Sequence, residues 1–265
     1  GKEPCSKDCQ PSCDCGKYVE IWNNVFMEYY KSKDGTYSKL KQQNVDTGMG
    51  LERITFLLQG KTTPFDTEIF EPIMEKLESL QKIDDIKSRR IIAEHLRSSM
   101  MIISDGGRPS NIDRGYILRR LIRRMTRHLN KLQISLDELG CLIDLDIEIL
   151  KEMYPDLDKN KEIIKQVILE EKDKFVKTLS HGEREFEKAI QKLKQENKDI
   201  VDGQTIFKLY ETYGFPPEIT ADLAEEQGFK IDMTEFDKLF KEHQDKSRMG
   251  SEQKFKGGLA DQNEQ

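Results

Sequence analysis

The sequence lacks any long apolar stretch, and no run approaches the ~18 consecutive apolar residues that a membrane-spanning helix needs. A signal peptide is also missing, because the first fifteen residues are polar and rich in cysteine. No internal repeat is visible, and no Ser/His or Cys/His constellation indicates covalent catalysis. The first absence argues against a membrane span, and the last fits a reaction without a covalent enzyme intermediate.

Apolar residues are also scarce in the 265-residue chain, at 36% against 35% charged residues. The mean hydropathy is −0.72, which favours exposed helices over a thick sheet core. The length allows one large domain or two small ones. A net charge of −6 argues against a general polyanion binder, but a local basic patch can still contact nucleic acid. Because the chain does not begin with Met, we expect it to be a fragment of a longer protein.

Four cysteines crowd residues 1–16 in a C-x3-C-x3-C-x-C arrangement: Cys5, Cys9, Cys13 and Cys15. Four thiols so close could surround one tetrahedral Zn²⁺, although the spacing is not a common zinc-ribbon pattern. Two disulfides would need an oxidising compartment, and free thiols in a loop are the third alternative. The fifth cysteine, Cys141, stands in an apolar helical stretch and is predicted to lie in the core.

A β-hairpin is predicted near the start, with strands over Tyr18–Tyr30 and Tyr37–Val45. The second strand leads directly into an amphipathic helix, and Gly48 and Gly50 are expected where the backbone turns sharply between them. Asp46 precedes this corner and Arg53 follows it by one helical turn. A carboxylate for an ammonium group and a guanidinium for a phosphate suit a site for an amino acid and a nucleotide. The alternative is a plain strand–turn–helix corner with a surface ion pair.

From Asp66 onward the pattern is helical, and His95 falls among apolar residues as a predicted core histidine. The helix predicted over Asp113–Leu132 has an apolar stripe formed by Leu118, Leu121, Ile122, Met125 and Leu129. Its remaining arc is basic and consists of Arg119, Arg120, Arg123, Arg124, Arg127 and Lys131. Arginine in preference to lysine favours phosphate contact, and the alternative is a solvated basic face. Asn111, in the preceding loop, offers the donor and acceptor that a base edge requires.

Further helices are predicted over Lys159–Lys194, Gln204–Tyr213, Glu218–Gln227 and Thr234–Lys246, and a loose polar tail from Ser247. The segment from Asp46 to Arg53 resembles motif 3 of the class II aminoacyl-tRNA synthetases, in the form found in alanyl-tRNA synthetases. The resemblance extends to three other blocks in family order, at Glu20–Met27, Arg108–Arg120 and Leu209–Pro216. Together the four blocks cover nearly the whole chain.

The resemblance implies an α+β, mainly α fold. Residues 1–61 would form the antiparallel β end of a class II synthetase catalytic domain, with the Cys-rich loop, the hairpin and motif 3. Residues 62–248 would form an all-helical tRNA-recognition domain, and residues 249–265 a polar tail leading toward an editing domain that the chain does not contain. Motifs 1 and 2 find no match, so we expect these residues alone to be inactive in adenylate formation.

The implied activity is that of a cytoplasmic alanine–tRNA ligase, which activates L-alanine with ATP and Mg²⁺ and transfers it to the 3′ end of its tRNA. By the resemblance, Asn23 and Val25 line the alanine pocket, Asp46 holds the amino group and Gly48 leaves room for a small side chain. Gly50 belongs to the same motif, and Arg53 contacts ATP phosphate as the catalytic residue. No membrane is implied as a partner.

In the family, an Asn and an Asp read the G·U wobble pair of the tRNA acceptor stem. Asn111 matches the first, and Glu211 stands in the place of the second with one extra methylene. The expected phosphate contacts are Arg114, Arg119, Arg120, Arg123 and Arg127. Two rival interpretations are a stand-alone module that binds the acceptor stem without making adenylate, and a helical scaffold whose basic helix serves a protein partner.

Overall fold

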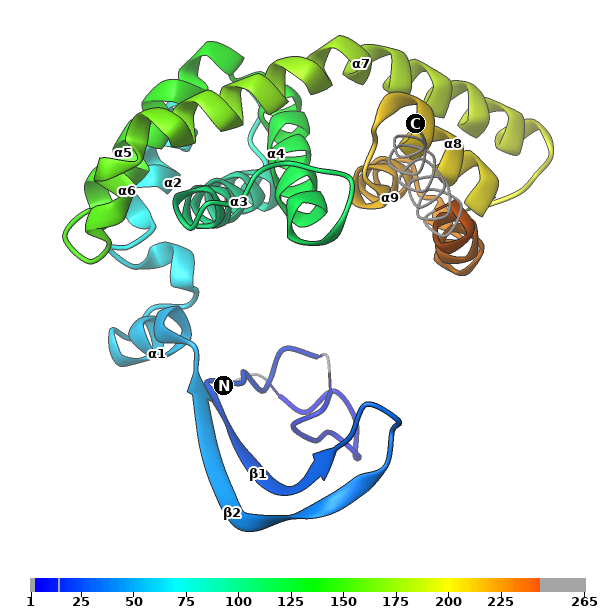
Figure 1. Ribbon diagram of the computed structural model, residues 1–265. Helices are drawn as coiled ribbons and strands as arrows, with labels where there is room; N and C mark the ends of the chain where they lie inside the picture. Colours follow the sequence, from blue (N-terminus) through cyan, green and yellow to red (C-terminus); the bar gives the residue numbers. More distant parts are fainter. Residues whose placement is uncertain (1–2, 14, 244–265) are drawn as a thin grey trace, which may run out of the picture. The chain divides into compact units, whose positions relative to one another are not determined.

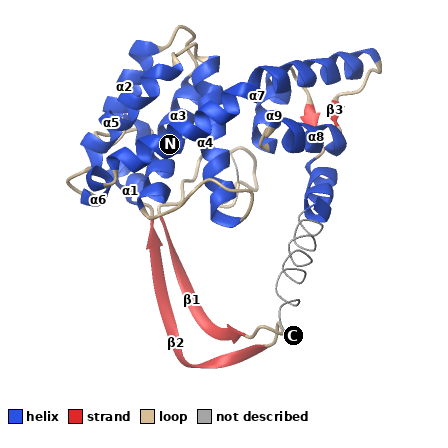
Figure 2. Cartoon of the chain, turned by 45° about the horizontal axis from the view of Figure 1, so that its top comes forward, coloured by secondary structure: helices blue, strands red, loops and turns tan. Residues whose placement is uncertain are grey.

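A computed structural model describes residues 3–13 and 15–243. The chain divides into two compact units, Gly1–Met74 and Glu75–Gln265. Helices dominate the described residues, and their strands form one hairpin and one very short pair (Figure 2). The predicted mainly α, α+β fold is therefore confirmed. Within the described ranges, no helix combines the length and the apolar character needed to cross a membrane.

The first unit is built on the predicted hairpin, which pairs β1 (Trp22–Lys31) with β2 (Tyr37–Met49) in antiparallel fashion (Figure 1). In the connecting turn, Asp34 Oδ1 accepts a hydrogen bond from the Thr36 amide at 3.1 Å. Gly35 there has φ +89°, a conformation that favours glycine. Neither strand contains a buried residue, so the hairpin is an exposed two-stranded ribbon.

The strand–helix junction differs from the expectation at one of its two glycines. Strand β2 continues through Gly48, which pairs with Asn23 in the ladder, so the predicted sharp turn at Gly48 is wrong. The junction lies at Gly50, whose amide donates to Ile21 O at 3.0 Å just before α1 (Leu51–Leu58). The 3-10 helix η1 (Pro64–Asp66) then leads to α2 (Glu71–Leu80).

The second unit is helical along most of its length, and Figure 1 shows its long helix α7 passing over both of its helical groups. Its elements are α3 (Ile86–Ser104), α4 (Asp113–Lys131), η2 (Leu136–Glu138), α5 (Leu139–Leu150), α6 (Pro155–Lys159), α7 (Lys161–Gln195), β3 (Ile200–Val201), α8 (Gly203–Tyr213), α9 (Pro217–Glu226) and β4 (Lys230–Ile231). Strands β3 and β4 pair in parallel. Residues 233–243 are helical, and the rest of the predicted last helix and the polar tail lie outside the described residues.

The first of its two cores lies between α3 and α4 and confirms the apolar stripe predicted for α4. Leu118, Ile122, Met125 and Leu129 have no exposed surface, and Leu121 is half-buried beside them. His95 of α3 is buried as predicted. Burying each large apolar side chain stabilises the fold by roughly 2 kcal/mol, so the spacing of the stripe is sufficient to fix which face of α4 turns inward.

The second core lies under the C-terminal half of α7 and contains Phe175, Phe186, Phe215 and Ile219. Gly182 permits this packing, because a Cβ there would lie 2.3 Å from the Phe215 ring. Cys141 was predicted to join a core, and that prediction is wrong because its side chain is exposed. The buried face of α5 is formed by Leu139, Leu142, Ile143, Ile147 and Leu150, and the helical period turns Cys141 away from it.

Candidate functional site

The residues expected to bind a small amino acid meet on one face of the hairpin. The ladder pairs Asn23 with Gly48 and Val25 with Asp46. Directly opposed residues of an antiparallel pair point to the same side, and alternate residues share a face. The pair between these two, Asn24 with Thr47, belongs to the other face of the hairpin. There Thr47 Oγ1 donates to Asn24 Oδ1 at 2.9 Å.

This face offers a carboxylate beside an open strip of backbone. Asp46 is exposed, and its Oδ1 accepts a hydrogen bond from the Thr47 amide at 2.9 Å. Among the described residues, apart from Gly48 and its two chain neighbours, no heavy atom lies within 4 Å of the position that a Cβ on Gly48 would take. A small ligand can therefore approach the strand at Gly48 and place a cationic group against Asp46.

Arg53 stands in the first turn of α1 and is tied to the segment that precedes β1. Its Nη1 donates to Glu20 O at 2.8 Å. Its side chain passes over Gly50, where an added Cβ would lie 3.2 Å from Arg53 Cδ. Gly50 thus allows the guanidinium to lie close to the chain, and the side chain stays exposed enough to meet an anion.

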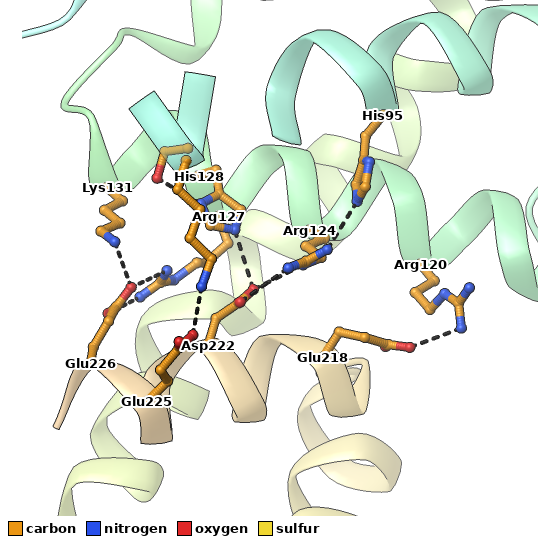
Figure 3. A network of polar contacts seen from close by, with 12 residues as sticks. His95, Arg120, Arg124, Arg127, His128, Lys131, Glu218, Asp222, Glu225 and Glu226 are labelled. Atoms are coloured by element: carbon orange, nitrogen blue, oxygen red, sulfur yellow. Dashed lines mark hydrogen bonds and ion pairs between the residues drawn. The ribbon is translucent and has the colours of Figure 1, made fainter. Parts of the chain in front are cut away.

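The basic arc of α4 differs most from the expectation, because α9 covers it with acids. Glu218, Asp222 and Glu226 repeat every four residues along one face of α9. Figure 3 shows these carboxylates pointing at the arginines of α4. The ion pairs are Arg120–Glu218 at 2.8 Å, Arg124–Asp222 at 2.8 Å and Arg127–Glu226 at 2.5 Å. We call these three pairs the α4–α9 ladder.

Arg123 also makes its polar contacts within the second unit. It contacts the buried carboxylate of Glu171 on α7 at 2.6 Å and donates to Gly214 O at 2.7 Å. Arg127 is 4% exposed. The prediction of an open cationic face is therefore wrong for Arg123 and Arg127. The compensating acids stand in other helices, so the sequence of α4 gives no sign of them.

Two histidines border the ladder (Figure 3). Burial and the charge of Arg124 lower the pKa of His95 to about 4, so its imidazole is neutral near pH 7. Burial disfavours ionisation of Asp222, but hydrogen bonds with His128 and Arg124 outweigh it and lower the pKa of this carboxyl. The Arg124–Asp222 pair of the ladder therefore stays charged near neutral pH.

A pocket of about 590 Å³ opens between the loop before α4 and the end of α8. Asn111 and Glu211, one hundred residues apart, both line it, together with Arg119, Arg120 and Arg123. Arg114 is exposed in the first turn of α4 but is not among the lining residues. The structure thus brings together the two residues expected to read bases, with arginines beside them.

Close packing positions the loop that carries Asn111. A Cβ on Gly115 would lie 2.5 Å from Arg108 O, so only glycine lets this loop approach α4. Ser110 N donates to Gly115 O at 3.0 Å. Arg119 Nη1 then donates to Asn111 Oδ1 and orients its amide.

Tyr116, Tyr210 and His243 are among the lining residues that sequence reasoning did not assign to the site. Tyr116 and Tyr210 pack edge to face with ring centroids 6.1 Å apart. His243 Nε2 lies 3.6 Å from Glu211 Oε1. Tyr210 neighbours Glu211 in the sequence, which is a usable signal, but nothing in the sequence links His243 to this site. The pocket combines amide, carboxylate and guanidinium groups with aromatic walls, as single bases and base edges require.

The described range 3–243, apart from residue 14, contains one group of thiols able to hold a metal ion: Cys5, Cys9 and Cys15. Cys13 accepts a hydrogen bond from the Gln10 amide at 3.3 Å.

Comparison with known proteins identifies the family of the chain. Residues 2–265 match the family described as "tRNA synthetases class II (A)", and the chain belongs to that family. Similar proteins include the alanine–tRNA ligase of Borrelia hermsii (strain HS1 / DAH), 48% identical over 98% of this chain and 45% of that protein. The alanine–tRNA ligase of Treponema denticola is 48% identical over 100% of this chain and 46% of its own length. That of Thermotoga petrophila is 40% identical over 93% of this chain and 29% of its own length. The chain thus spans less than half the length of these relatives.

Proposed function

We propose that this chain supplies motif 3 and the acceptor-stem recognition of an alanine–tRNA ligase, which forms alanyl-adenylate from L-alanine and ATP and transfers alanine to tRNA. The observation that carries the proposal is the hairpin register, which gathers Asn23, Val25, Asp46 and Gly48 on one face. A module that only bound tRNA would have no use for a carboxylate beside an open strip of backbone. The ligase is therefore preferred over the binding module.

Alanine would bind with its ammonium against Asp46 and its methyl group over Gly48. Val25, directly opposite Asp46, supplies an apolar contact, and Asn23 supplies a donor and an acceptor opposite Gly48. Because Gly48 carries no side chain, the backbone there leaves room for the methyl group of alanine.

ATP would meet the guanidinium of Arg53, which can pair with phosphate oxygens at two nitrogens. Mg²⁺, held by the nucleotide, would neutralise part of the phosphate charge. Catalysis then consists of positioning and charge neutralisation for in-line attack of the alanine carboxylate on the α-phosphate. No residue of this chain needs to form a covalent bond to the substrate.

The acceptor stem would enter the pocket that Asn111 and Glu211 line. Arg119 would orient the Asn111 amide toward a base. The exposed Arg114 and the pocket-lining Arg120 would supply phosphate contacts. Arg123 and Arg127 have a different task in this proposal. They hold α7, α8 and α9 against α4 and so fix the shape of the pocket.

The test replaces Asp46 in the intact enzyme. Asp46→Asn keeps the shape of the side chain and removes the counter-charge of the substrate ammonium. Losing one partner of a desolvated pair costs about 3–5 kcal/mol, so kcat/KM for alanine in ATP–pyrophosphate exchange should fall by roughly two to four orders of magnitude.

Glu28→Gln is the matched control, because Glu28 is another carboxylate of the same hairpin, on strand β1, and pairs with Lys39 at 3.7 Å. Its alanine kinetics should stay unchanged. Unaltered alanine kinetics in Asp46→Asn would remove Asp46 from the pocket. An intact wild-type protein that binds the tRNA but performs no exchange would favour the binding module.

A further inference from the structure

The Cys-rich loop before the hairpin brings sulfur atoms together without joining them covalently. The Sγ atoms of Cys5, Cys9 and Cys15 lie within 4.8 Å of one another. Cys9 Sγ and Cys15 Sγ are 3.8 Å apart. All five cysteines of the chain are free thiols.

This spacing is that of metal-bound thiolates. Two thiolates of a tetrahedral zinc site, each about 2.3 Å from the ion, lie about 3.8 Å apart. Sulfur atoms of a disulfide are about 2.05 Å apart, and unrelated thiols in a loop have no reason to converge on one point. The Cys9–Cys15 separation therefore agrees with one edge of a zinc tetrahedron.

One backbone amide of the loop points at a sulfur atom. The Gln10 amide donates to Cys13 Sγ at 3.3 Å. Zinc binds thiolates, so a divalent cation would replace the thiol protons.

The loop has no other source of order. Residues 3–13 and 15–17 include no buried side chain, and a segment without a core needs a covalent or metal cross-link to hold one conformation. Turns at Ser6–Cys9 and Gln10–Cys13, closed by backbone hydrogen bonds of 3.3 and 2.9 Å, return the chain to the same point.

We propose that Cys5, Cys9 and Cys15, completed by Cys13, hold one structural Zn²⁺ that fixes this loop in front of strand β1. Cys13 needs a small shift to reach the ion, because its sulfur does not belong to the group of three. The four thiols release their protons to solvent as the ion binds, and no oxidation or reduction occurs. Four sulfur ligands fill the tetrahedral coordination of the ion. No coordination position remains for a water or a substrate, so the site is structural.

The test measures zinc in the intact protein, purified without chelator, by inductively coupled plasma mass spectrometry. Cys9→Ser and Cys15→Ser should each contain one zinc per chain less than wild type, and so should Cys13→Ser. Cys141→Ser is the matched control, because Cys141 is an exposed, isolated thiol of helix α5 and its loss should leave the zinc content unchanged.

A second measurement uses only wild-type protein and so does not depend on the folding of a variant. Alkylation followed by peptide mass mapping should modify Cys141 at once, and the four loop cysteines only after chelation. Immediate alkylation of all four, or equal zinc content in wild type, Cys9→Ser and Cys15→Ser, would overturn the site. Zinc retained in Cys13→Ser alone would overturn the assignment of the fourth ligand.

Discussion

His95 of α3 is buried beside the guanidinium of Arg124, with Nε2 and Nη1 3.4 Å apart. Burial and this charge lower its pKa to about 4, against about 6.5 in an unfolded chain. Between these values the unfolded chain binds a proton that the folded chain does not. The contribution of His95 to stability is therefore complete above pH 6.5 and is lost as the pH falls toward 4.

We predict that the urea midpoint of wild type falls between pH 7 and pH 5, and that His95→Gln weakens this dependence. His181→Gln is the control, because His181 is exposed on α7. Its pH dependence should match wild type. Equal slopes for all three proteins would show that His95 does not bind its proton differently on folding, and that His128, whose pKa burial also lowers, carries the pH dependence.

Asn111 is the residue to which we assign base reading, and its removal should affect one tRNA more than another. Asn111→Ala should reduce aminoacylation of an acceptor stem with the wobble pair by about 1–3 kcal/mol, and that of a Watson–Crick variant by little. Asn130→Ala, at the far end of α4, is the control and should affect neither. Equal losses on both stems would remove Asn111 from the reading role.

Glu211 extends the same experiment, since the resembled family has Asp at this place. Its carboxylate lies 3.6 Å from His243 Nε2, at the pocket. If the longer side chain reads the stem with the help of this contact, Glu211→Asp should weaken discrimination. If the extra methylene is only tolerated, discrimination in Glu211→Asp should hold or improve.

At the scale of the helix, α4 has two kinds of arginine. Arg127 is buried against Glu226, so Arg127→Ala should destabilise the protein by on the order of 3 kcal/mol. It should leave the salt dependence of tRNA binding unchanged. Arg114 is exposed, so Arg114→Ala should cost less than about 0.5 kcal/mol of stability and make the salt slope shallower by about one counterion.

Urea unfolding and filter binding over a salt series measure the two effects separately. Each variant serves as the control for the other, because both remove one guanidinium from the same helix. The assignment would fail if Arg127→Ala kept full stability and lost one counterion of salt dependence.

The sequence predicts which helices and strands form better than it predicts which of them pack together. Hydrophobic period alone identifies the inward face of α4, since Leu118 and Ile122 must be buried wherever the helix packs. The same period cannot say that Glu218 and Asp222, about a hundred residues later, face the arginines of α4. Charged residues spaced along a helix have the pattern of a solvated surface, so the sequence overestimates the open basic area.

For the candidate site too, the sequence identifies single residues but not which of them lie together. The resemblance supplies Asn111 and Glu211, and the structure shows that they share a pocket. His243 reaches that pocket through the packing of residues 233–243, which no local signal encodes. The prediction that Cys141 is buried failed for a related reason. Helix α5 is apolar on most of its surface, so its sequence does not show which side Cys141 occupies.

At the scale of the whole chain, the two units differ in how well their backbones are covered. The hairpin has no buried residue in either strand, whereas α3 and α4 enclose the first core. A two-stranded ribbon without a covered face is only marginally stable in water. Hydrogen exchange of the 265-residue chain should therefore be fast over 22–49 and slow over the buried turns of α4.

Exchange measured by mass spectrometry at two protein concentrations tests this difference. Hairpin amides as well protected as those of α4 would contradict it. Protection of the hairpin that rose with concentration would show that the exposed ribbon pairs with another copy of the chain, as unprotected strands do.

Arg123 meets Glu171 on α7 and the carbonyl of Gly214 at the end of α8, three residues after Glu211. A lysine could take only one of these positions, because it has a single nitrogen where arginine has three. Arg123→Lys conserves the charge, yet it would release the wall of the pocket that carries Glu211. Under the proposed function, a protein with this change would stay folded and would discriminate less well between acceptor stems.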